Sequence, residues 1–358
     1  MIRKCLAIGI ILLFVGTYII PAIAQNTEKS RSPSRGNWLY VGGSGPGNYT
    51  RIQDAIDNAN DGDTVFVYDD SSPYDENLLI NRSIRLHGEN WNTTRIKGNA
   101  DIKQHIIQIN ADGVTIQGFK IQDSTNVPGA LYYGVAIYSN DNEIYGNIFI
   151  NNEGCILLSD ASRNSIHDNR MNDGKKSSYA IRIYKGQDNE VFDNYISGVD
   201  WGIEVIGSLF NKIHGNRFTQ IRDIGAYVVQ SLPPDNKGYN QIYENCFSGG
   251  NYGLLIRYCS FIFIYRNEIT NCQYGVYRIS ASFIFFKRNN FINNTCNAYF
   301  YDRGIMNKWY RNYWDDWDRF GIYKIQGETV GGWEGDPVPI EQYDWFPTWK
   351  PYDILGMR

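Results

Sequence analysis

Two pairs of charged side chains are the residues best placed to do acid–base chemistry. Asp168 and Asp193 each stand one place before an asparagine in successive copies of a repeated unit. If those copies stack, the two carboxylates lie about 5 Å apart, near the separation used by retaining glycosidases. Arg182 and Glu204 occupy equivalent positions on the other strand of successive repeats, so stacking would also make them neighbours. They are a candidate base and acid. These four are the candidate catalytic residues, although stacked charges are also usual on a solvated repeat surface.

The unit that would stack them has the pattern N-x-Φ-x-x-N-x-Φ, where Φ is apolar. Residues 189–196 are one copy, and its second asparagine returns at intervals of 22 to 29 residues. A period in the low twenties, with insertions confined to some steps, indicates a solenoid. These second asparagines are Asn147, Asn169, Asn194, Asn216, Asn245, Asn267, Asn289 and Asn312.

Short runs of apolar alternation between the copies predict strands. Residues 179–183 and 201–205 are examples, and no window between the copies has the i, i+3, i+4, i+7 spacing of a solenoid helix. Two or three strands per turn, each paired with the same strand one turn on, predict an all-β, right-handed parallel β-helix. We expect about ten turns of roughly 22 to 30 residues. The frame of leucine-rich repeats, which have a similar period, is absent.

Stacking turns each repeat position into a column. The asparagines are expected at a bend, where Asn tolerates left-handed backbone and its amide bonds its counterpart one turn on. Arg278 breaks the apolar alternation of its run, so the register is expected to slip by one residue there. The column expected to form the core contains Val135, Cys155, Ile181, Ile203, Ala226, Leu254, Val276 and Ala298.

A line of aromatic residues precedes the Gly or Ala of one strand in several turns. Flat rings spaced one turn apart suit stacking against the sugar rings of a long glycan, since they offer large contact area with little lost entropy. The alternative is that stacked aromatics only stabilise the β-helix surface by cross-strand pairing. The predicted glycan-binding residues are Tyr133, Tyr179, Trp201, Tyr252 and Tyr274.

Metal chemistry is only weakly indicated, and no cofactor is predicted. The four histidines are scattered, and those that share a column, His167 and His214, lie two turns apart. Calcium is an alternative at two aspartate-rich loops, residues 61–70 and 315–318, although hydrated surface carboxylates are the favoured explanation. Five cysteines follow residue 24, an odd number that allows one or two disulfides with a thiol left over.

Composition divides the chain into four segments. Residues 1–24 have the basic start, apolar run and small-residue end of a signal peptide, with an uncleaved anchor as the alternative. Residues 25–37 form a polar, flexible linker, 38–314 the β-helix, and 315–358 an irregular Trp-rich cap. A short helix at 50–60, N-capped by Thr50, would cover the first turn. The net charge of −4 and the absence of a basic run argue against nucleic acid.

Two stretches resemble known families. Residues 41–45, 49–56, 61–65, 74–77 and 84–89 are similar to the opening turns of pectin methylesterases and many secreted β-helix proteins, but no paired Gln, Asp and Asp catalytic motifs follow. The Asn-rich repeats together with Asn312-Tyr313-Trp314-Asp315-Asp316-Trp317 resemble secreted pectin-lyase-like β-helix proteins of the NosD type. That resemblance implies a right-handed β-helix on the cell surface or in the periplasm. Few histidines and four methionines do not favour the copper role of that group.

These observations predict a secreted or cell-surface protein, without a membrane span in the mature chain, that binds a glycan or another surface polymer without cleaving it. One alternative is a polysaccharide-active lyase, glycoside hydrolase or esterase that uses the candidate carboxylates. Another is a purely structural component of the envelope or of adhesion. Function must be argued from the site, because the fold alone supports all three.

Overall fold

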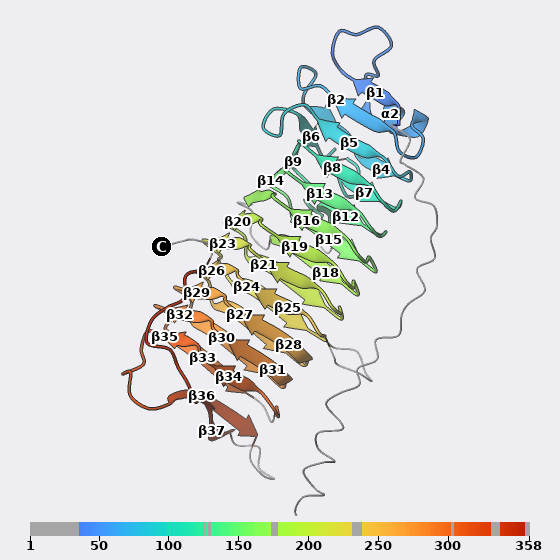
Figure 1. The fold of residues 1–358 in the computed structure, drawn as a ribbon. Coiled ribbons are helices and arrows are strands. Elements are labelled where there is room, and N and C mark those ends of the chain that lie inside the picture. Colours follow the sequence, from blue (N-terminus) through green and yellow to red (C-terminus); the bar gives the residue numbers. More distant parts are fainter. Residues whose placement is uncertain are drawn as a thin grey trace, which may run out of the picture. The chain divides into compact units, whose positions relative to one another are not determined.

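The computed structural model describes residues 36–99, 101–124, 126–127, 130–172, 178–230, 238–301, 304–330 and 337–354. The expected signal peptide, and all but the last two residues of the expected linker, lie outside the described residues. The described part is a stack of short strands with one short helix (Figure 1). The predicted parallel β-helix is confirmed, with about 12 turns instead of about ten.

The strands form three columns, and within each column a strand pairs in parallel with its counterpart one turn along the chain. Column 1 contains β4 (Leu78–Ile80), β7 (Ile107–Ile109), β12 (Tyr133–Ile137), β15 (Gly154–Ser159), β18 (Tyr179–Tyr184), β21 (Trp201–Ile206), β24 (Ile224–Val229), β27 (Tyr252–Arg257), β30 (Tyr274–Ile279), β33 (Cys296–Tyr301) and β36 (Tyr323–Val330).

Column 2 contains β1 (Trp38–Val41), β2 (Thr64–Val67), β5 (Arg85–Gly88), β8 (Thr115–Gln117), β13 (Glu143–Tyr145), β16 (Ser165–His167), β19 (Glu190–Phe192), β22 (Lys212–His214), β25 (Gln241–Tyr243), β28 (Ser260–Tyr265), β31 (Ser282–Lys287), β34 (Lys308–Tyr310) and β37 (Pro337–Asp344). Column 3 contains β3 (Tyr74–Asp75), β6 (Arg95–Lys97), β9 (Lys120–Gln122), β14 (Ile148–Ile150), β17 (Arg170–Asn172), β20 (Tyr195–Ser197), β23 (Arg217–Thr219), β26 (Cys246–Ser248), β29 (Glu268–Thr270), β32 (Asn290–Ile292) and β35 (Tyr313–Trp314). A separate hairpin joins β10 (Asn126–Val127) to β11 (Ala130–Leu131).

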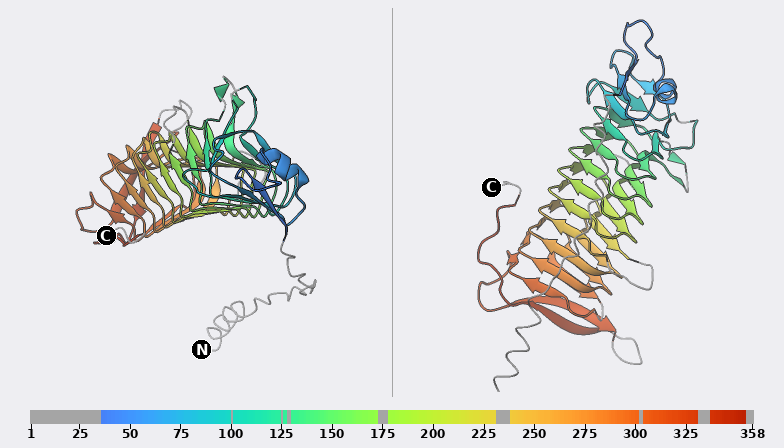
Figure 2. Two further views of the ribbon diagram at one scale, coloured as in Figure 1. Left: turned by 90° about the horizontal axis from the view of Figure 1, so that it is seen from above. Right: turned by 45° about the vertical axis from the view of Figure 1, so that its right-hand side comes forward.

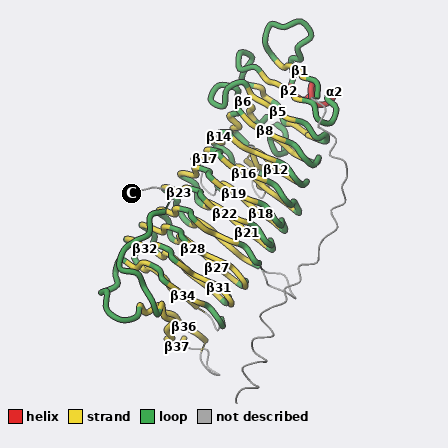
Figure 3. Tube along the Cα trace, in the orientation of Figure 1, coloured by secondary structure: helices red, strands yellow, loops and turns green. Residues whose placement is uncertain are grey.

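The short strands leave a bend between the columns in every turn, as the alternation of strand and loop along the tube shows (Figure 3), and the turns repeat closely along the stack (Figure 2). Inward side chains of all three columns form one continuous apolar core. In column 1, Ile156 pairs with both Val135 and Ile181, so the expectation that Cys155 shares their column is wrong. The residue pairs between β12 and β15 do not include Cys155, which is buried beside Ile156.

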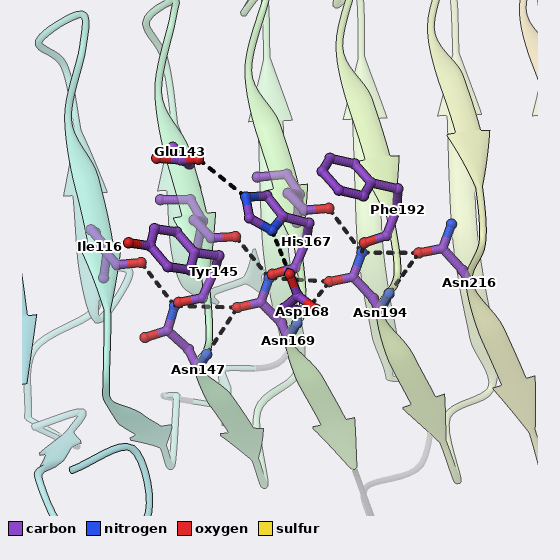
Figure 4. Close-up of polar contacts among 12 residues, drawn as sticks. Ile116, Glu143, Tyr145, Asn147, His167, Asp168, Asn169, Phe192, Asn194 and Asn216 are labelled. Carbon is purple, nitrogen blue, oxygen red and sulfur yellow. Dashed lines mark hydrogen bonds and ion pairs between the residues drawn. The ribbon is translucent and has the colours of Figure 1, made fainter.

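Buried asparagines join the turns at the bend between columns 2 and 3 (Figure 4). Asn194 Nδ2 donates to Asn216 Oδ1 of the next turn at 2.9 Å, and to the backbone oxygens of Ile166 and Phe192. Asn194 Oδ1 accepts from both nitrogens of Asn169. The same amide-to-amide bond runs without a break from Asn147 to Asn312, at 2.9 to 3.2 Å. The asparagine side chains thereby provide hydrogen-bond partners for backbone groups that cannot take part in strand pairing at the bend.

A second asparagine ladder precedes the strands of column 2. Its amides bond from Asn142 to Asn240 at 2.9 to 3.0 Å. Neither ladder uses left-handed backbone at the asparagine itself. The residue before each anchor takes that conformation instead, for example Asp168 with φ 53° and Asp193 with φ 51°. The conformational expectation for the anchor asparagines is therefore wrong.

Arg278 does not shift the register, contrary to the prediction. It pairs with Ile256 on one side and Phe300 on the other, in the row of buried residues of column 1. Its side chain is fully buried, donates to the backbone oxygen of Ala281, and lies with Cζ 5.0 Å from the centroid of the Phe300 ring. A buried charge is tolerated when hydrogen bonds and a ring face replace water around it.

The N-terminal end of the solenoid is covered by α2 (Ile52–Asn58). Arg51 is its N-cap residue, not Thr50, and makes no side-chain cap bond. The Glu76 carboxylate accepts from the backbone N–H groups of Ile52 and Gln53 instead. A residue from the following turn thus satisfies the free donors of this helix, which a local capping signal does not reveal.

The C-terminal cap is more regular than predicted. β36 and β37 form an antiparallel hairpin, with β36 continuing column 1 and β37 continuing column 2. Asp344, which is fully buried, ends the asparagine ladder: Oδ2 accepts from both nitrogens of Asn312 and from Trp314 Nε1. No disulfide joins any two cysteines of the described part, and no helix in it is long and apolar enough to cross a membrane.

Asn194→Ala should lower the free energy of unfolding by about 3 kcal/mol, because it leaves several buried backbone groups without partners. Urea unfolding followed by circular dichroism measures this change. The matched control is Asn172→Ala, at an exposed position of β17, which should change stability by less than about 0.5 kcal/mol. Equal effects of the two substitutions would contradict a structural role for the ladder.

Asp344→Asn should destabilise the last turns by about 2 kcal/mol, because either orientation of the new amide turns an N–H group toward existing donors. Limited proteolysis of the cap and urea unfolding measure the effect. Asp353→Asn, on an exposed carboxylate near the C-terminal end of the described residues, is the control. A cap as resistant as wild type in the Asp344 variant would show that this carboxylate does not hold the end of the ladder.

Candidate functional site

Arg182 and Glu204 lie side by side on the outward face of column 1. They are register partners on β18 and β21, with Arg182 Nε 2.7 Å from Glu204 Oε2. The Glu204 side chain is 6% exposed and that of Arg182 30%. The structure therefore brings together the base and acid that stacking predicted, with the carboxylate buried behind the guanidinium.

Tyr133 completes this group from two turns before Arg182. Glycine at position 154 permits the arrangement, because a Cβ there would come within 2.3 Å of the Tyr133 ring. The ring consequently lies across the next strand and is only 2% exposed. Burial raises the pKa of the Tyr133 hydroxyl, although the neighbouring Arg182 acts in the opposite direction. Tyr133 thus supports the site from beneath and offers no open face for stacking.

A cleft of about 390 Å³ opens beside this group. It is lined by His105, Leu131, Tyr133, Tyr138, Leu157, Ser159, Arg182 and Tyr184. His105 Nδ1 accepts from the backbone N–H of Tyr133 at 2.9 Å, so Nε2 carries the proton of the neutral ring and faces the Tyr138 hydroxyl at 3.1 Å. Burial lowers the pKa of His105, which favours this neutral form. The repeat pattern does not identify His105 and Tyr138 as site residues, because neither belongs to a repeated motif.

Burial raises the pKa of Glu204, and Arg182 opposes that rise. A buried carboxyl group of this kind gives up its proton less readily than an exposed one. Such a group is suited either to donate a proton or to hold the orientation of a cation, here the Arg182 guanidinium. The geometry alone supports both roles.

The predicted aromatic line is present on column 1, starting on the strands that carry Arg182 and Glu204, but it is interrupted. Tyr179 and Trp201 have ring centroids 5.3 Å apart, and Tyr252 and Tyr274 lie stacked at 5.6 Å. Ile224 occupies the position between the two pairs. All four aromatic side chains are half-buried.

A second aromatic row runs beside this line and follows the positions of Arg182 and Glu204. Tyr227 is the register partner of Glu204, and its ring lies edge-on to Trp201 at 5.5 Å. Leu255 takes the next position, and Tyr277 and Tyr299 follow it, stacked at 5.5 Å. Each of these tyrosines stands three residues after the position of the first aromatic line, so that comparing this position across the repeats would have identified them.

Asp168 and Asp193 lie in a different place, on exposed turns between columns 2 and 3. Asp168 Oδ2 is 2.8 Å from His167 Nδ1, while His167 Nε2 faces Glu143 Oε1 at 3.2 Å (Figure 4). Asp193 lies over Gly215, where an added Cβ would come within 2.3 Å of its Oδ1. The four candidate catalytic residues therefore form two separate groups.

His167 belongs to a continuous stack of rings on column 2. It lies between Tyr145, at 5.0 Å, and Phe192, at 4.6 Å, with planes within 11° of parallel. His214 follows in the same row, with Nε2 3.0 Å from Glu190 Oε1. Tyr243 and Tyr265 complete the row at 4.6 and 4.8 Å spacings. Both histidines are held by ring faces and carboxylates.

In the described part of the chain, no group of three or more His, Cys, Asp or Glu side chains is arranged to hold a metal ion. The aspartates suggested for calcium bind protein groups instead. Asp63 accepts from the backbone of Asn37 and Asn60, and Asp315 and Asp316 accept from Asn297.

Comparison with solved structures finds the same fold at low sequence identity. A mutant DFA-IIIase from Arthrobacter chlorophenolicus, in complex with DFA-III, matches with TM-score 0.52 and 12% identity over 89% of this chain and 88% of that one. The polygalacturonase of Erwinia carotovora gives 0.50 and 12% over 78% and 89%. The Dettilon tailspike protein gives 0.51 and 12% over 82% and 63%. At such identities the likeness shows the fold.

The comparison with curated proteins found no match. One family model does match, over residues 56–248 and 234–319, and its description is periplasmic copper-binding protein (NosD). The two segments together cover most of the chain, including the asparagine ladders, the Arg182–Glu204 pair and both aromatic rows. This chain therefore belongs to the NosD family.

Proposed function

We propose that this protein binds a glycan, or a surface polymer of similar chemistry, along the outward face of column 1 and does not cleave it. The observation that carries this proposal is the set of half-buried rings on successive turns, Tyr179 and Trp201 and then Tyr252 and Tyr274. The rings of each pair pack against one another, and each side chain keeps part of its surface accessible. Such rings lose little freedom on binding and give large apolar contact with a sugar ring.

The solved neighbours support this choice of ligand class, since a polygalacturonase and a DFA-IIIase bound to DFA-III act in carbohydrate chemistry on the same fold. The family description and the signal-peptide pattern both favour a periplasmic or cell-surface location, where such polymers occur. Tyr133, which is buried, would act by supporting Arg182, and the open rings would contact the glycan.

The arrangement of carboxylates favours binding over hydrolysis. Glycosidases use two carboxyl groups that flank the bond they cleave. Among the described residues that line the cleft there is no carboxylate, and Glu204 lies behind Arg182. Asp168 and Asp193 are in a separate group on exposed turns.

Copper, which the family description names, does not fit the described donors. His167 and His105 each have both ring nitrogens close to protein partners, and His214 Nε2 faces Glu190. Met171 is buried in the core, and Cys246 and Cys272 are buried with the pKa raised by burial to about 11 and about 12. Copper sites need deprotonated sulfur or open imidazole ligands that converge. The proposed function accordingly contains no copper-dependent step.

A second candidate function is a polysaccharide-active enzyme that uses Glu204 as a general acid. The observation in its favour is the raised pKa of this buried carboxyl beside a cation and a cleft. Release of new reducing or unsaturated ends from a polysaccharide, abolished in Glu204→Gln, would establish this function in place of binding alone.

Trp201→Ala should weaken retention by the bound polysaccharide about tenfold, because it removes the largest open ring of the row. Affinity electrophoresis against a panel of acidic and neutral polysaccharides measures the change. Trp345→Ala, at a Trp that is 61% exposed in the cap, is the control and should leave mobility unchanged. Unchanged retention in the Trp201 variant would refute binding along column 1.

Glu204→Gln should alter how stability depends on pH. Because the pKa of Glu204 is higher in the folded chain than its ordinary value of 4.5, the folded state holds the proton more tightly. Stability from this group is therefore present at low pH and is lost as pH rises through the raised pKa. Urea midpoints from about pH 4 to about pH 8 should fall less steeply in Glu204→Gln than in wild type. Asp193→Asn, an exposed carboxylate, should follow the wild-type profile, and identical profiles for all three would refute the burial effect.

A further inference from the structure

A basic groove lies on column 2, far along the chain from the Arg182–Glu204 pair. It spans β28 and β31 and the bends that follow them, and its volume is about 360 Å³. That size is within the range of small-ligand sites. The lining residues are Phe263, Tyr265, Arg266, Phe285, Lys287 and Arg288.

The floor of the groove is aromatic. Phe263 and Phe285 are register partners whose rings stack at 5.2 Å with planes 8° apart. Tyr265 stands in the next outward row and continues the stack from Tyr243. All three lining rings are half-buried, so packing fixes their orientation while part of each ring lines the groove. A ring so fixed is a platform for the apolar face of a sugar.

The wall of the groove is cationic. Arg266 is paired with Glu244, with Nε 2.8 Å from Oε1, so its charge is largely compensated. Lys287 and Arg288 are exposed, and neither makes an ion pair with a carboxylate in the described part of the chain. Arg311 follows one turn on, exposed, with Cζ 5.3 Å from the Tyr310 ring centroid. A polymer running along the stack would meet a guanidinium on successive turns, about 4.8 Å apart.

The positive charge is confined to this section of the bend. The position before the anchor asparagine holds Asp168 and Asp193 in earlier turns, and Arg288 and Arg311 in later ones. Because the chain as a whole carries a net charge of −4, this patch is a local feature and not part of a general excess of positive charge.

We propose that this groove binds an anionic polysaccharide, with a sugar ring on Phe285 and Tyr265 and its carboxylate or sulfate group held by Lys287 and Arg288. Guanidinium groups suit both anions, since they donate two parallel hydrogen bonds. Single-stranded nucleic acid also stacks on aromatic residues, but it needs a basic track along its backbone, and the earlier turns of the same bend are acidic. The proposal does not rest on glycan binding at column 1.

The test measures binding of the full chain to polygalacturonate and to dextran sulfate by affinity electrophoresis. The uncharged partners are fully methyl-esterified pectin and plain dextran. At least one charged polymer should be retained more strongly than its uncharged partner, and added salt should weaken that retention. Stronger retention by polygalacturonate only would show that the groove binds carboxylate groups. Stronger retention by dextran sulfate only would show that it binds sulfate groups. Equal retention of charged and uncharged polymers would overturn the proposal.

The variant that tests the groove itself is Arg288→Glu, which should weaken retention by the charged polymer at least about tenfold. Arg217→Glu, an exposed arginine on β23, makes the same charge change elsewhere and should have little effect. Phe285→Ala, checked for folding by circular dichroism, should also weaken binding. Trp201→Ala should leave the contribution of Arg288 unchanged, which separates this site from column 1. Equal losses in the Arg288 and Arg217 variants, or tighter binding of oligothymidylate than of either polymer, would overturn the assignment.

Discussion

The outward surface of the turns from β13 to β34 depends on the bond between one buried asparagine amide and the next. An amide can donate and accept at once, so a column of asparagines satisfies itself and still holds the backbone groups that the bend excludes from the strand ladders. Asn194 does this with its neighbours Asn169 and Asn216. Because the bond tolerates no slip, each turn lies in register with the last, and one residue type repeated at a position becomes a row on the surface.

Those rows produce two faces with different chemistry. Column 1 carries the open aromatic rings and, at one point, the buried Arg182–Glu204 pair with Tyr133 beneath it. Column 2 carries a stack of aromatic and imidazole rings in its middle turns and a basic groove in its later turns. Neighbouring positions on a strand point to opposite sides, so the core residues between these groups can stay apolar whatever the surface carries. The scaffold therefore accommodates a binding surface at little cost to its core.

Much of the fold could be predicted because it is periodic. The recurrence of Asn and apolar positions identified the solenoid and the pairing of Arg182 with Glu204 one turn apart. Features that break the period could not be predicted in this way. The strand pairing does not include Cys155, and Glu76 caps a helix from the following turn. Arg278 lies in the core because the backbone oxygen of Ala281 accepts its hydrogen bond and the Phe300 ring packs against its guanidinium. His105 and Tyr138 at the cleft, and the hairpin that ends at Asp344, depend on contacts specific to one turn.

The central claim is that ordered rows on this solenoid hold a polysaccharide without cleaving it. The most direct test incubates the wild-type protein with a panel of acidic and neutral polysaccharides and follows both retention of the protein and the appearance of new reducing or unsaturated ends. Retention of the protein on at least one polymer, with no new ends after prolonged incubation, is the result expected. New ends would show that the protein is an enzyme, and absence of retention on every polymer would contradict a glycan-binding role.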